Sequence, residues 1–497
     1  MIDKIKKTVK QTAIYSLGGL STKLIGLILL PLYTSHLSTS EYGILSIIEI
    51  TSQILMGFFT LHFSEAMMRW IATEKSPFKH KTIVFTSLFS LVIISSLLLI
   101  SFYPLTDYFS QVIFGSLQYK YYLELVLIWS ALGIIFNIPF SLLRIQEKAV
   151  FFVLITASKF TLILFANIYF IVGLNLGVEG IIYSQIIGEI FSLLITTPFI
   201  IKNIHLKFDF TLFKDMFKYG LPMAFSAVAA LLLSFGDRYI LNYFLPLSSV
   251  GIYSLGFKLS SIINVFLLQS FQLGFVPIAF KMFDQENSQR FFSKVLTYFT
   301  FILAIAVLSI SFFGKEIIFL FANQEYHEAY TVIPLIAFAF LIKGINLIFI
   351  LGFQYSKKTS RYAIIIFAGL VLTIGVNILL IPIIGIYGAG VSMLVSYIFM
   401  AVASYLYSQK LFFVKYEIAK VTGMTVLSAA LYLTSILIPF ANIYLETVTK
   451  LILLISFPYI LYFFNFYEEI ELLRIKQSWL KWRNPKRWKD NFRQIKF

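Results

Sequence analysis

Stretches of about 20 apolar residues recur along the whole length of this chain, and short polar connections separate them. An α-helix rises about 1.5 Å per residue and needs about 20 apolar residues to cross a bilayer. Only 13% of the 497 residues are charged, against about 25% in a soluble globular protein. Strands of a membrane barrel would alternate apolar and polar residues instead. The pattern therefore predicts an all-α integral membrane protein.

Fourteen membrane-spanning helices are expected, joined by connections too short to form a soluble domain. The first span follows a run of lysines, as a signal peptide does, but it is too long for one and is expected to be retained. The expected spans are 11–34, 44–68, 82–104, 121–143, 150–172, 178–201, 216–244, 251–280, 294–314, 330–354, 361–382, 387–409, 417–439 and 446–466.

Lysine and arginine residues set the expected orientation, because they are enriched in cytoplasmic loops. With the N-terminus inside, only Lys120, Lys315 and Lys450 of the 40 basic residues fall in outside loops. Five others fall within spans, and the rest lie on the inside. We therefore expect a multi-pass protein of a bacterial cytoplasmic membrane with both termini in the cytoplasm. The net charge of +16 is then explained by the basic residues of the inside segments, and we expect no binding of nucleic acid.

The chain contains an internal repeat with an offset of about 208 residues. The offset contains six spans, so the two halves have the same orientation and are related by an axis along the membrane normal. The matches are L-S-T-S-E-Y-G-I-L-S from Leu37 with L-P-L-S-S-V-G-I-Y-S from Leu245, Gln146 with Gln354, and G-V-E-G-I-I-Y-S from Gly177 with G-I-Y-G-A-G-V-S from Gly385.

The repeat predicts two parallel six-helix lobes around a central cavity, with substrate between the lobes. Two further helices are appended. The expected units are an N-terminal lobe at 1–207, a C-terminal lobe at 208–412, a helix pair at 413–467 and a basic cytoplasmic tail at 468–497.

Five basic residues are expected inside the membrane. A charge at the bilayer centre costs about 2.5–3.5 kcal/mol on insertion scales, so each should face water, a partner charge or substrate. Small and polar residues share a helical face with several of them, which predicts a hydrated, cationic cavity. The candidate substrate-binding residues are Lys23, Lys159, Arg238, Lys258 and Lys343.

Acidic residues in or near the spans support a second interpretation, in which the basic residues sit in structural ion pairs. The candidate ion-pair or ion-coupling acids are Glu49, Glu189 and Asp237. Asp237 and Arg238 are adjacent and could pair at a helix end. For any single basic residue both interpretations stay open, whereas the excess of bases favours a cationic cavity for the whole set.

Enzyme chemistry has little support in the composition. The chain has no cysteine, and its five histidines lack the spacing of metal ligands. We expect no catalytic residue, no metal site and no cofactor. A membrane acyltransferase would need an embedded histidine, and His62 is the only histidine within a span. A polysaccharide polymerase would need a large outside loop, and the outside loops are short.

Three segments carry a family resemblance, which covers roughly the first 410 residues. They are Y-S-L-G-G-L-S-T-K-L-I-G-L-I-L-L-P-L-Y-T-S-H-L-S-T-S-E-Y-G-I from Tyr15, D-R-Y-I-L-N-Y-F-L-P-L-S-S-V-G-I-Y-S-L-G-F-K-L from Asp237, and G-I-Y-G-A-G-V-S from Gly385. They resemble the first helix, the seventh-to-eighth helix junction and the start of helix twelve of polysaccharide-transport flippases. These flippases belong to the multidrug/oligosaccharidyl-lipid/polysaccharide exporter superfamily.

The resemblance implies a flippase and no enzyme. Family members move undecaprenyl-pyrophosphate-linked oligosaccharides, the repeat units of surface polysaccharide, from the inner to the outer leaflet by alternating access. Lys23, Arg238 and Lys258 match basic positions of the quoted segments, whereas Lys159 and Lys343 rest on burial alone. The implied partners are the lipid-linked substrate and membrane lipid, with polysaccharide polymerase machinery as a further candidate. A coupling ion or use of the membrane potential stays open.

Two alternatives remain. A cation-coupled multidrug exporter of the same superfamily would need deep acidic residues, of which the chain has few. A membrane-embedded polysaccharide polymerase or acyltransferase belongs to a different class, and the internal repeat argues against it.

The start of the basic tail is expected to form an interfacial helix. Tryptophan favours the membrane boundary, and basic residues attract anionic lipid. The apolar face would hold Leu472, Ile475, Trp479 and Trp482, beside Lys476, Lys481 and Arg483, with Pro485 as the end.

Overall fold

The computed structural model describes residues 28–438, 442–464, 466–473 and 477. These residues form helices and contain no β-strand. Thirteen of the described helices are long and apolar enough to cross a membrane. They overlap the second to the fourteenth expected span, whereas most of the first, 11–34, lies outside the described residues. The prediction of an all-α membrane protein is confirmed.

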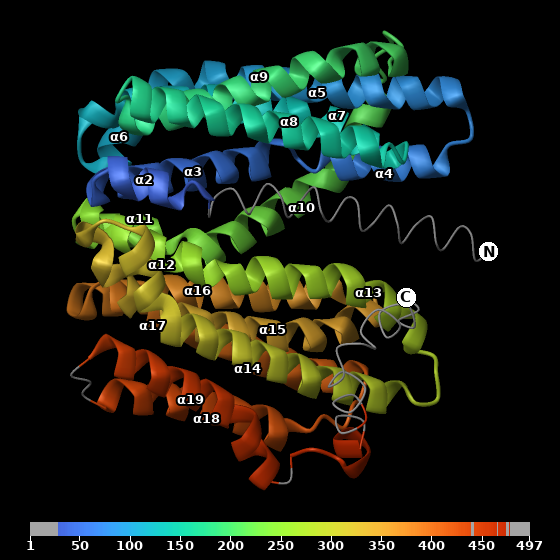
Figure 1. The fold of residues 1–497 in the computed structure, drawn as a ribbon. Helices are drawn as coiled ribbons and strands as arrows, with labels where there is room; N and C mark the ends of the chain where they lie inside the picture. The colour runs from blue at the N-terminus through green and yellow to red at the C-terminus, as the bar shows by residue number, and fades with distance from the viewer. Residues whose placement is uncertain (1–27, 439–441, 465, 474–476, 478–497) are drawn as a thin grey trace, which may run out of the picture.

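The helices form two groups (Figure 1), and the first group runs from α2 to α9. Its elements are α2 (Leu30–His36), α3 (Thr39–Phe59), α4 (Phe63–Thr73), α5 (Pro77–Phe102), η1 (Tyr103–Leu105), α6 (Thr106–Phe114), η2 (Leu117–Tyr119), α7 (Lys120–Ile145), α8 (Ala149–Ile168), η3 (Tyr169–Gly173) and α9 (Gly177–Asn203).

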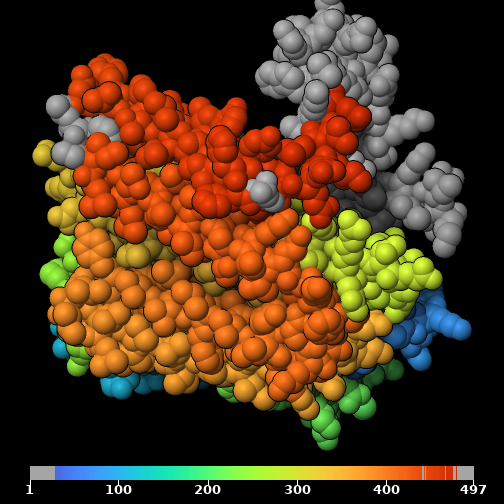
Figure 2. All heavy atoms as spheres, turned by 90° about the horizontal axis from the view of Figure 1, so that it is seen from below, coloured from blue at the N-terminus to red at the C-terminus, as the bar shows by residue number. Residues whose placement is uncertain are grey.

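The second group follows, with α10 running obliquely between the groups in Figure 1. Its elements are α10 (Phe210–Phe235), α11 (Asp237–Phe244), α12 (Leu247–Ile262), η4 (Ile263–Gln269), α13 (Ser270–Met282), α14 (Ser288–Phe321), η5 (Gln324–Thr331), α15 (Ile333–Tyr355), α16 (Thr359–Ile384) and α17 (Ile386–Leu411). The appended pair is α18 (Ile418–Leu437) and α19 (Ile443–Phe463). Figure 2 shows the pair, in red, covering one part of this face beside the orange helices.

The backbone at two helix starts follows the internal repeat. Gly177 begins α9 with φ 55°, and Gly385 precedes α17 with φ 61°. Glycine adopts this left-handed conformation at little cost, because it has no Cβ. Two glycines 208 residues apart thus both have a positive φ at the same place in the helix order.

The two groups meet in direct backbone contact where α3 crosses α12. A Cβ on Gly43 would lie 2.1 Å from the Leu247 carbonyl oxygen, and a Cβ on Gly251 would lie 1.9 Å from the Thr39 carbonyl oxygen. Only glycine permits this approach. We call this contact the crossing, and the end of the molecule that holds it, on the left in Figure 1, the crossing end.

The crossing has the symmetry that the repeat predicts. The hydroxyls of Ser46 and Ser254, which are 208 residues apart, share a hydrogen bond of 2.7 Å. The glycines and their carbonyl partners are separated by the same offset. A pseudo-twofold axis therefore passes between α3 and α12, as expected for two parallel repeats.

Further contacts join the two groups at the crossing end. The Tyr326 hydroxyl on η5 donates to the Leu37 and Ser38 carbonyl oxygens at 2.9 and 3.0 Å. The Thr34 hydroxyl donates to the Phe321 carbonyl oxygen at 3.0 Å. These bonds connect the start of the first group to the end of α14 and to η5 at the crossing end.

Helix irregularities depart from the expected continuous spans. The span expected at 44–68 breaks between α3 and α4, where Leu61 and His62 have φ of 44° and 48°. A Cβ on Gly220 of α10 would lie 1.8 Å from the Leu61 carbonyl oxygen. This close packing coincides with the left-handed turn. The span expected at 216–244 likewise ends at Phe235, and α11 begins as a separate helix.

The appended pair is held to α14 by ion pairs near both of its ends. Near the start of α14, the Lys294 ammonium lies 2.9 Å from a Glu417 carboxylate oxygen and 2.6 Å from one of Glu468. Glu417 precedes α18, and Glu468 follows α19. One lysine thus ties together three segments that are distant in the sequence.

A second set of ion pairs lies near the end of α14. Glu446 on α19 pairs with Lys315 at 3.2 Å and with Lys450 at 2.8 Å. Lys450 also pairs with Glu316 at 2.7 Å and is only 6% exposed. With both ends fixed, α18 and α19 should move together with α14. Most of the expected interfacial helix of the tail lies outside the described residues.

Candidate functional site

Two neighbouring cavities lie at the inner side of the first group and at the junction with the second. The large cavity has a volume of about 460 Å³, and the small cavity about 160 Å³. Polar residues of the large cavity are Tyr33, Glu49, Asn137, Thr156, Lys159, Gln185, Glu189 and Lys258. Polar residues of the small cavity are Tyr42, Ser46, Glu49, Gln53, Arg238, Ser254, Lys258 and Ser261.

Lys258 of α12 lines both cavities, and so does Glu49 of α3. The Lys258 ammonium lies 5.5 Å from the centre of the Tyr33 ring and 5.7 Å from that of Tyr42. Both distances are within the range of about 6 Å for cation–π attraction. Among the described residues, no carboxylate oxygen lies within 4.0 Å of this ammonium. Lys258 is therefore a positive charge held by aromatic rings and open to both cavities.

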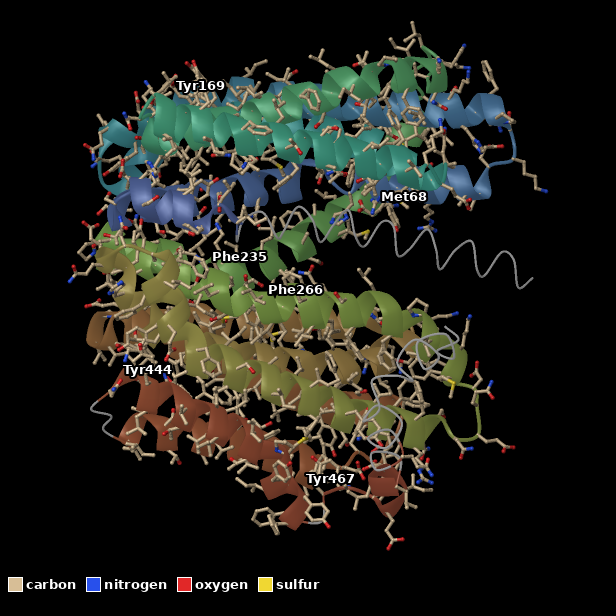
Figure 3. All side chains as sticks on the ribbon, in the orientation of Figure 1. Met68, Tyr169, Phe235, Phe266, Tyr444 and Tyr467 are labelled. Carbon is tan, nitrogen blue, oxygen red and sulfur yellow. The ribbon has the colours of Figure 1, made fainter. Side chains whose placement is uncertain are left out.

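Arg238 lies at the start of α11, and its side chain is 3% exposed. Its Nη1 donates to Asp237 Oδ1 at 2.7 Å, and the Tyr253 hydroxyl donates to Asp237 Oδ2 at 2.5 Å. The guanidinium also lies 4.0 Å from the centre of the Phe257 ring. Arg238 thus lines the small cavity, near Phe235 at the end of α10 (Figure 3), with its charge matched by a neighbour.

Lys159 and Glu189 form an ion pair in the wall of the large cavity. The Lys159 ammonium lies 2.8 Å from Glu189 Oε1. Glu189 is 7% exposed, and its Oε2 has no hydrogen-bond partner among the described residues. The ring of Phe136 lies 5.0 Å from the ammonium. This pair joins α8 to α9 inside the first group.

The remaining expected bases are placed differently. The Lys343 ammonium lies 5.7 Å from the Phe340 ring centre and 5.5 Å from that of Tyr397, and it lines neither cavity. Lys23 lies outside the described residues. The structure therefore gathers three of the five expected basic residues, Lys159, Arg238 and Lys258, around two cavities that share Lys258.

Sequence reasoning missed four polar residues of these cavities, which are Tyr33, Tyr42, Ser46 and Gln185. Tyr33 and Tyr42 flank Lys258, but aromatic residues are too frequent in the chain to single out two of them. Gln185 lies one helical turn before Glu189 on α9. The same search for polar residues at helical spacing, applied to the sixth span, would have found it.

Comparison with known protein families agrees with the sequence segments quoted above. The model of a family described as polysaccharide biosynthesis protein matches residues 8–283. An uncharacterized membrane protein of Methanocaldococcus jannaschii is 26% identical over 202 residues, which is 39% of this chain and 39% of that protein. The match therefore spans well under two thirds of that relative.

Solved structures share the fold. A lipid II flippase MurJ in an inward closed conformation matches with a TM-score of 0.70 and 14% identity, over 94% of this chain and 100% of that chain. An inward-facing multidrug resistance transporter of the MATE family matches with a TM-score of 0.65 and 14% identity, over 84% of this chain and 96% of that one. At this identity the matches show a common architecture of flippases and transporters, which are not enzymes.

Proposed function

Because this chain belongs to the polysaccharide biosynthesis protein family, we propose that it flips a lipid-linked oligosaccharide across a bacterial cytoplasmic membrane. The substrate would be an undecaprenyl-pyrophosphate-linked repeat unit of surface polysaccharide. The observation that carries the proposal is Lys258, which lines both cavities and has no carboxylate oxygen within 4.0 Å of its ammonium among the described residues.

The chemistry of the cavities suits such a substrate. A pyrophosphate needs cations, and Lys258 offers one. Glu49 lines both cavities as well, but its carboxylate does not lie within 4.0 Å of the Lys258 ammonium. A sugar needs hydrogen-bonding side chains, which Asn137, Thr156 and Gln185 supply in the large cavity. Lys23 is proposed to add a further charge from the first span.

Alternating access would come from movement of residues 1–207 against 208–412. With the N-terminus in the cytoplasm, the crossing end would face outward, and the contacts between α3 and α12 would lie on the outer side. Reporter fusions in the η5 segment Gln324–Thr331 and at the C-terminus test this orientation. An inside signal from the first fusion, or an outside signal from the second, would refute it.

Complementation of surface polysaccharide export tests the function. We expect Lys23→Ala and Lys258→Ala to abolish export while membrane levels stay normal, and Arg238→Lys to impair export more than Lys258→Arg does. The bidentate geometry of arginine explains the second expectation. Normal export by Lys23→Ala, Arg238→Ala and Lys258→Ala would exclude a cationic substrate site.

A cation-coupled multidrug exporter is the second candidate. The position of Glu49 in both cavities favours it, because a carboxylate can bind a cationic drug. In that case a deletion strain would become sensitive to cationic drugs, and Glu49→Gln would fail to restore resistance. Unchanged drug sensitivity together with lost surface polysaccharide would support the flippase.

A further inference from the structure

We propose that Glu189 binds a proton whenever an anionic phosphate takes its partner Lys159, so that substrate and one proton are bound and released together. This inference rests on the proposed function, because it requires the large cavity to receive a phosphate. It concerns the ion that accompanies transport, which the residues of the quoted segments do not identify.

The geometry places the pair where a ligand can compete for it. Lys159 and Glu189 both line the large cavity, with 2.8 Å between the ammonium and Oε1. The Lys159 side chain is 20% exposed and forms part of the cavity lining. A phosphate that approaches this ammonium meets Glu189 as its direct competitor, since both are anions that can accept a hydrogen bond from it.

The carboxylate has few other sources of stabilisation. Glu189 is 7% exposed, and its Oε2 has no hydrogen-bond partner in the described part of the chain. A buried charge without a partner is costly, and such a group neutralises instead of remaining ionised. The Lys159 ammonium is the opposite charge that the structure places in contact with Glu189.

In the described part of the chain, no cation other than Lys159 lies within 4.0 Å of the Glu189 carboxylate. From α3 comes Glu49, a second acid, and from α12 comes Lys258, both on the cavity wall. From α2 comes Tyr33. From α7, Gly133, Phe136 and Asn137 line the cavity, and none of them is charged. The charged residues of α5 all lie within its first five positions.

The exchange is balanced. When phosphate pairs with Lys159, Glu189 would lie beside a second anion, and it takes one proton from hydronium or a buffer acid on the open side. When the phosphate leaves, Lys159 returns to Glu189, and the proton passes to water or a buffer base on the side where release occurs. The O–H bond of the carboxyl forms as the bond between the proton and its donor breaks, and the reverse happens on release.

Linkage gives the direction of the pH effect. Since the complex holds one more proton than the free protein and ligand, affinity is highest at low pH. It falls as the pH rises, by up to about tenfold per pH unit while free Glu189 is ionised. The change in affinity cannot exceed about tenfold per pH unit, because only one proton is taken up.

Calorimetry of the purified full-length protein tests the proposal. The probe is farnesyl-pyrophosphoryl N-acetylglucosamine, a short-chain diester whose phosphates do not titrate between about pH 5.5 and 8.5. Binding heats in buffers of different ionisation enthalpy give the number of protons taken up. We expect about one proton per probe bound for the wild type.

Variants identify the group. Glu189→Gln should bind the probe without proton uptake, with affinity independent of pH and higher than the wild type at high pH, because Lys159 is then free. Glu189→Asp should retain the uptake. Glu49→Gln changes the other acid of the cavity and should also retain it.

Each outcome decides a different question. Probe binding without proton uptake by the wild type would overturn this inference and leave the flippase standing. Uptake that survives in Glu189→Gln but disappears in Glu49→Gln would also overturn it. No binding of the probe by the wild type at any pH would overturn the proposed function together with this inference.

Discussion

Adding a methyl group at the crossing should open the outer end of the protein. In Gly43→Ala the new Cβ would lie 2.1 Å from the Leu247 carbonyl oxygen, whereas ordinary contacts begin at 3.4 Å. The shortfall of about 1.3 Å cannot be relieved by a rotamer change, because the clashing atom belongs to the backbone. The helices α3 and α12 must separate or tilt, and overpacking of this kind costs about 1–3 kcal/mol.

The overpacking destabilises only the conformation in which α3 and α12 are in contact. In a state where α3 and α12 have moved apart, the methyl group meets no such clash, so the open state is favoured by the same amount. A difference of about 1–3 kcal/mol corresponds to a shift of about 5–150-fold in population. Gly251→Ala acts at the symmetric position, and its Cβ would lie 1.9 Å from the Thr39 carbonyl oxygen.

Both methyl groups require the same separation of the same two helices. The double variant should therefore shift the equilibrium by less than the sum of the single variants, as expected for sites in contact.

The natural chain has no cysteine, which provides a clean assay. A Gln53→Cys reporter in the small cavity would be labelled with a membrane-impermeant maleimide in intact cells. On the proposed orientation, labelling should be faster in Gly43→Ala. Gly274→Ala is the matched control, because a Cβ there meets nothing within 4 Å. Equal labelling rates in Gly43→Ala and Gly274→Ala would refute the reasoning.

Three further predictions concern ion pairs. Burial would raise the pKa of Glu417, but hydrogen bonds from Lys294 and a nearby threonine outweigh it and hold that pKa below 4.5. The stabilisation is complete above pH 4.5 and is lost as the pH falls through the lowered pKa, so acidification should lower the melting temperature of the wild type more than that of Glu417→Gln. Lys450→Ala should lower the melting temperature at neutral pH, with a loss of up to about 3 kcal/mol, because two carboxylates lose a buried partner. Arg238→Ala should reduce the level of folded protein, because it leaves Asp237 unpaired at a cost of about 3–5 kcal/mol. Adding Asp237→Asn to Arg238→Ala should restore the level of folded protein, measured by fluorescence-detected chromatography.

Exposed residues of like charge serve as controls for the melting experiments. Glu469→Gln and Lys410→Ala change side chains on the surface of the described chain. Neither should alter the melting temperature or its pH dependence measurably. An equal effect of these changes would show that net charge, and no particular pair, controls stability.

The helices could be predicted because each depends on its own stretch of sequence. Length and hydropathy require nothing from distant residues. The break at Leu61 and His62 could not be predicted in this way, since Gly220, which packs against it, comes from another helix. Nor does the sequence show whether 216–244 continues past Phe235 as one helix.

The candidate site, like the fold, could be predicted from the sequence only in part. The cost of burying a charge was enough to select Lys159, Arg238 and Lys258. The acidic partners of these bases could be predicted only in part. Asp237 is adjacent to Arg238 and was an evident candidate, whereas Glu189 meets Lys159 only because α8 and α9 pack side by side. Distances between helices depend on their rotation about their axes, which a single sequence does not specify.

The crossing is also the contact that two identical half-length chains would make with each other. In a symmetric dimer each residue meets its partner's counterpart reciprocally, and here Gly43 meets Leu247 as Gly251 meets Thr39. A homodimer of an ancestral six-helix protein would have needed a single glycine to form this contact twice. In the single chain, a change of either glycine is limited by a backbone carbonyl of the other half.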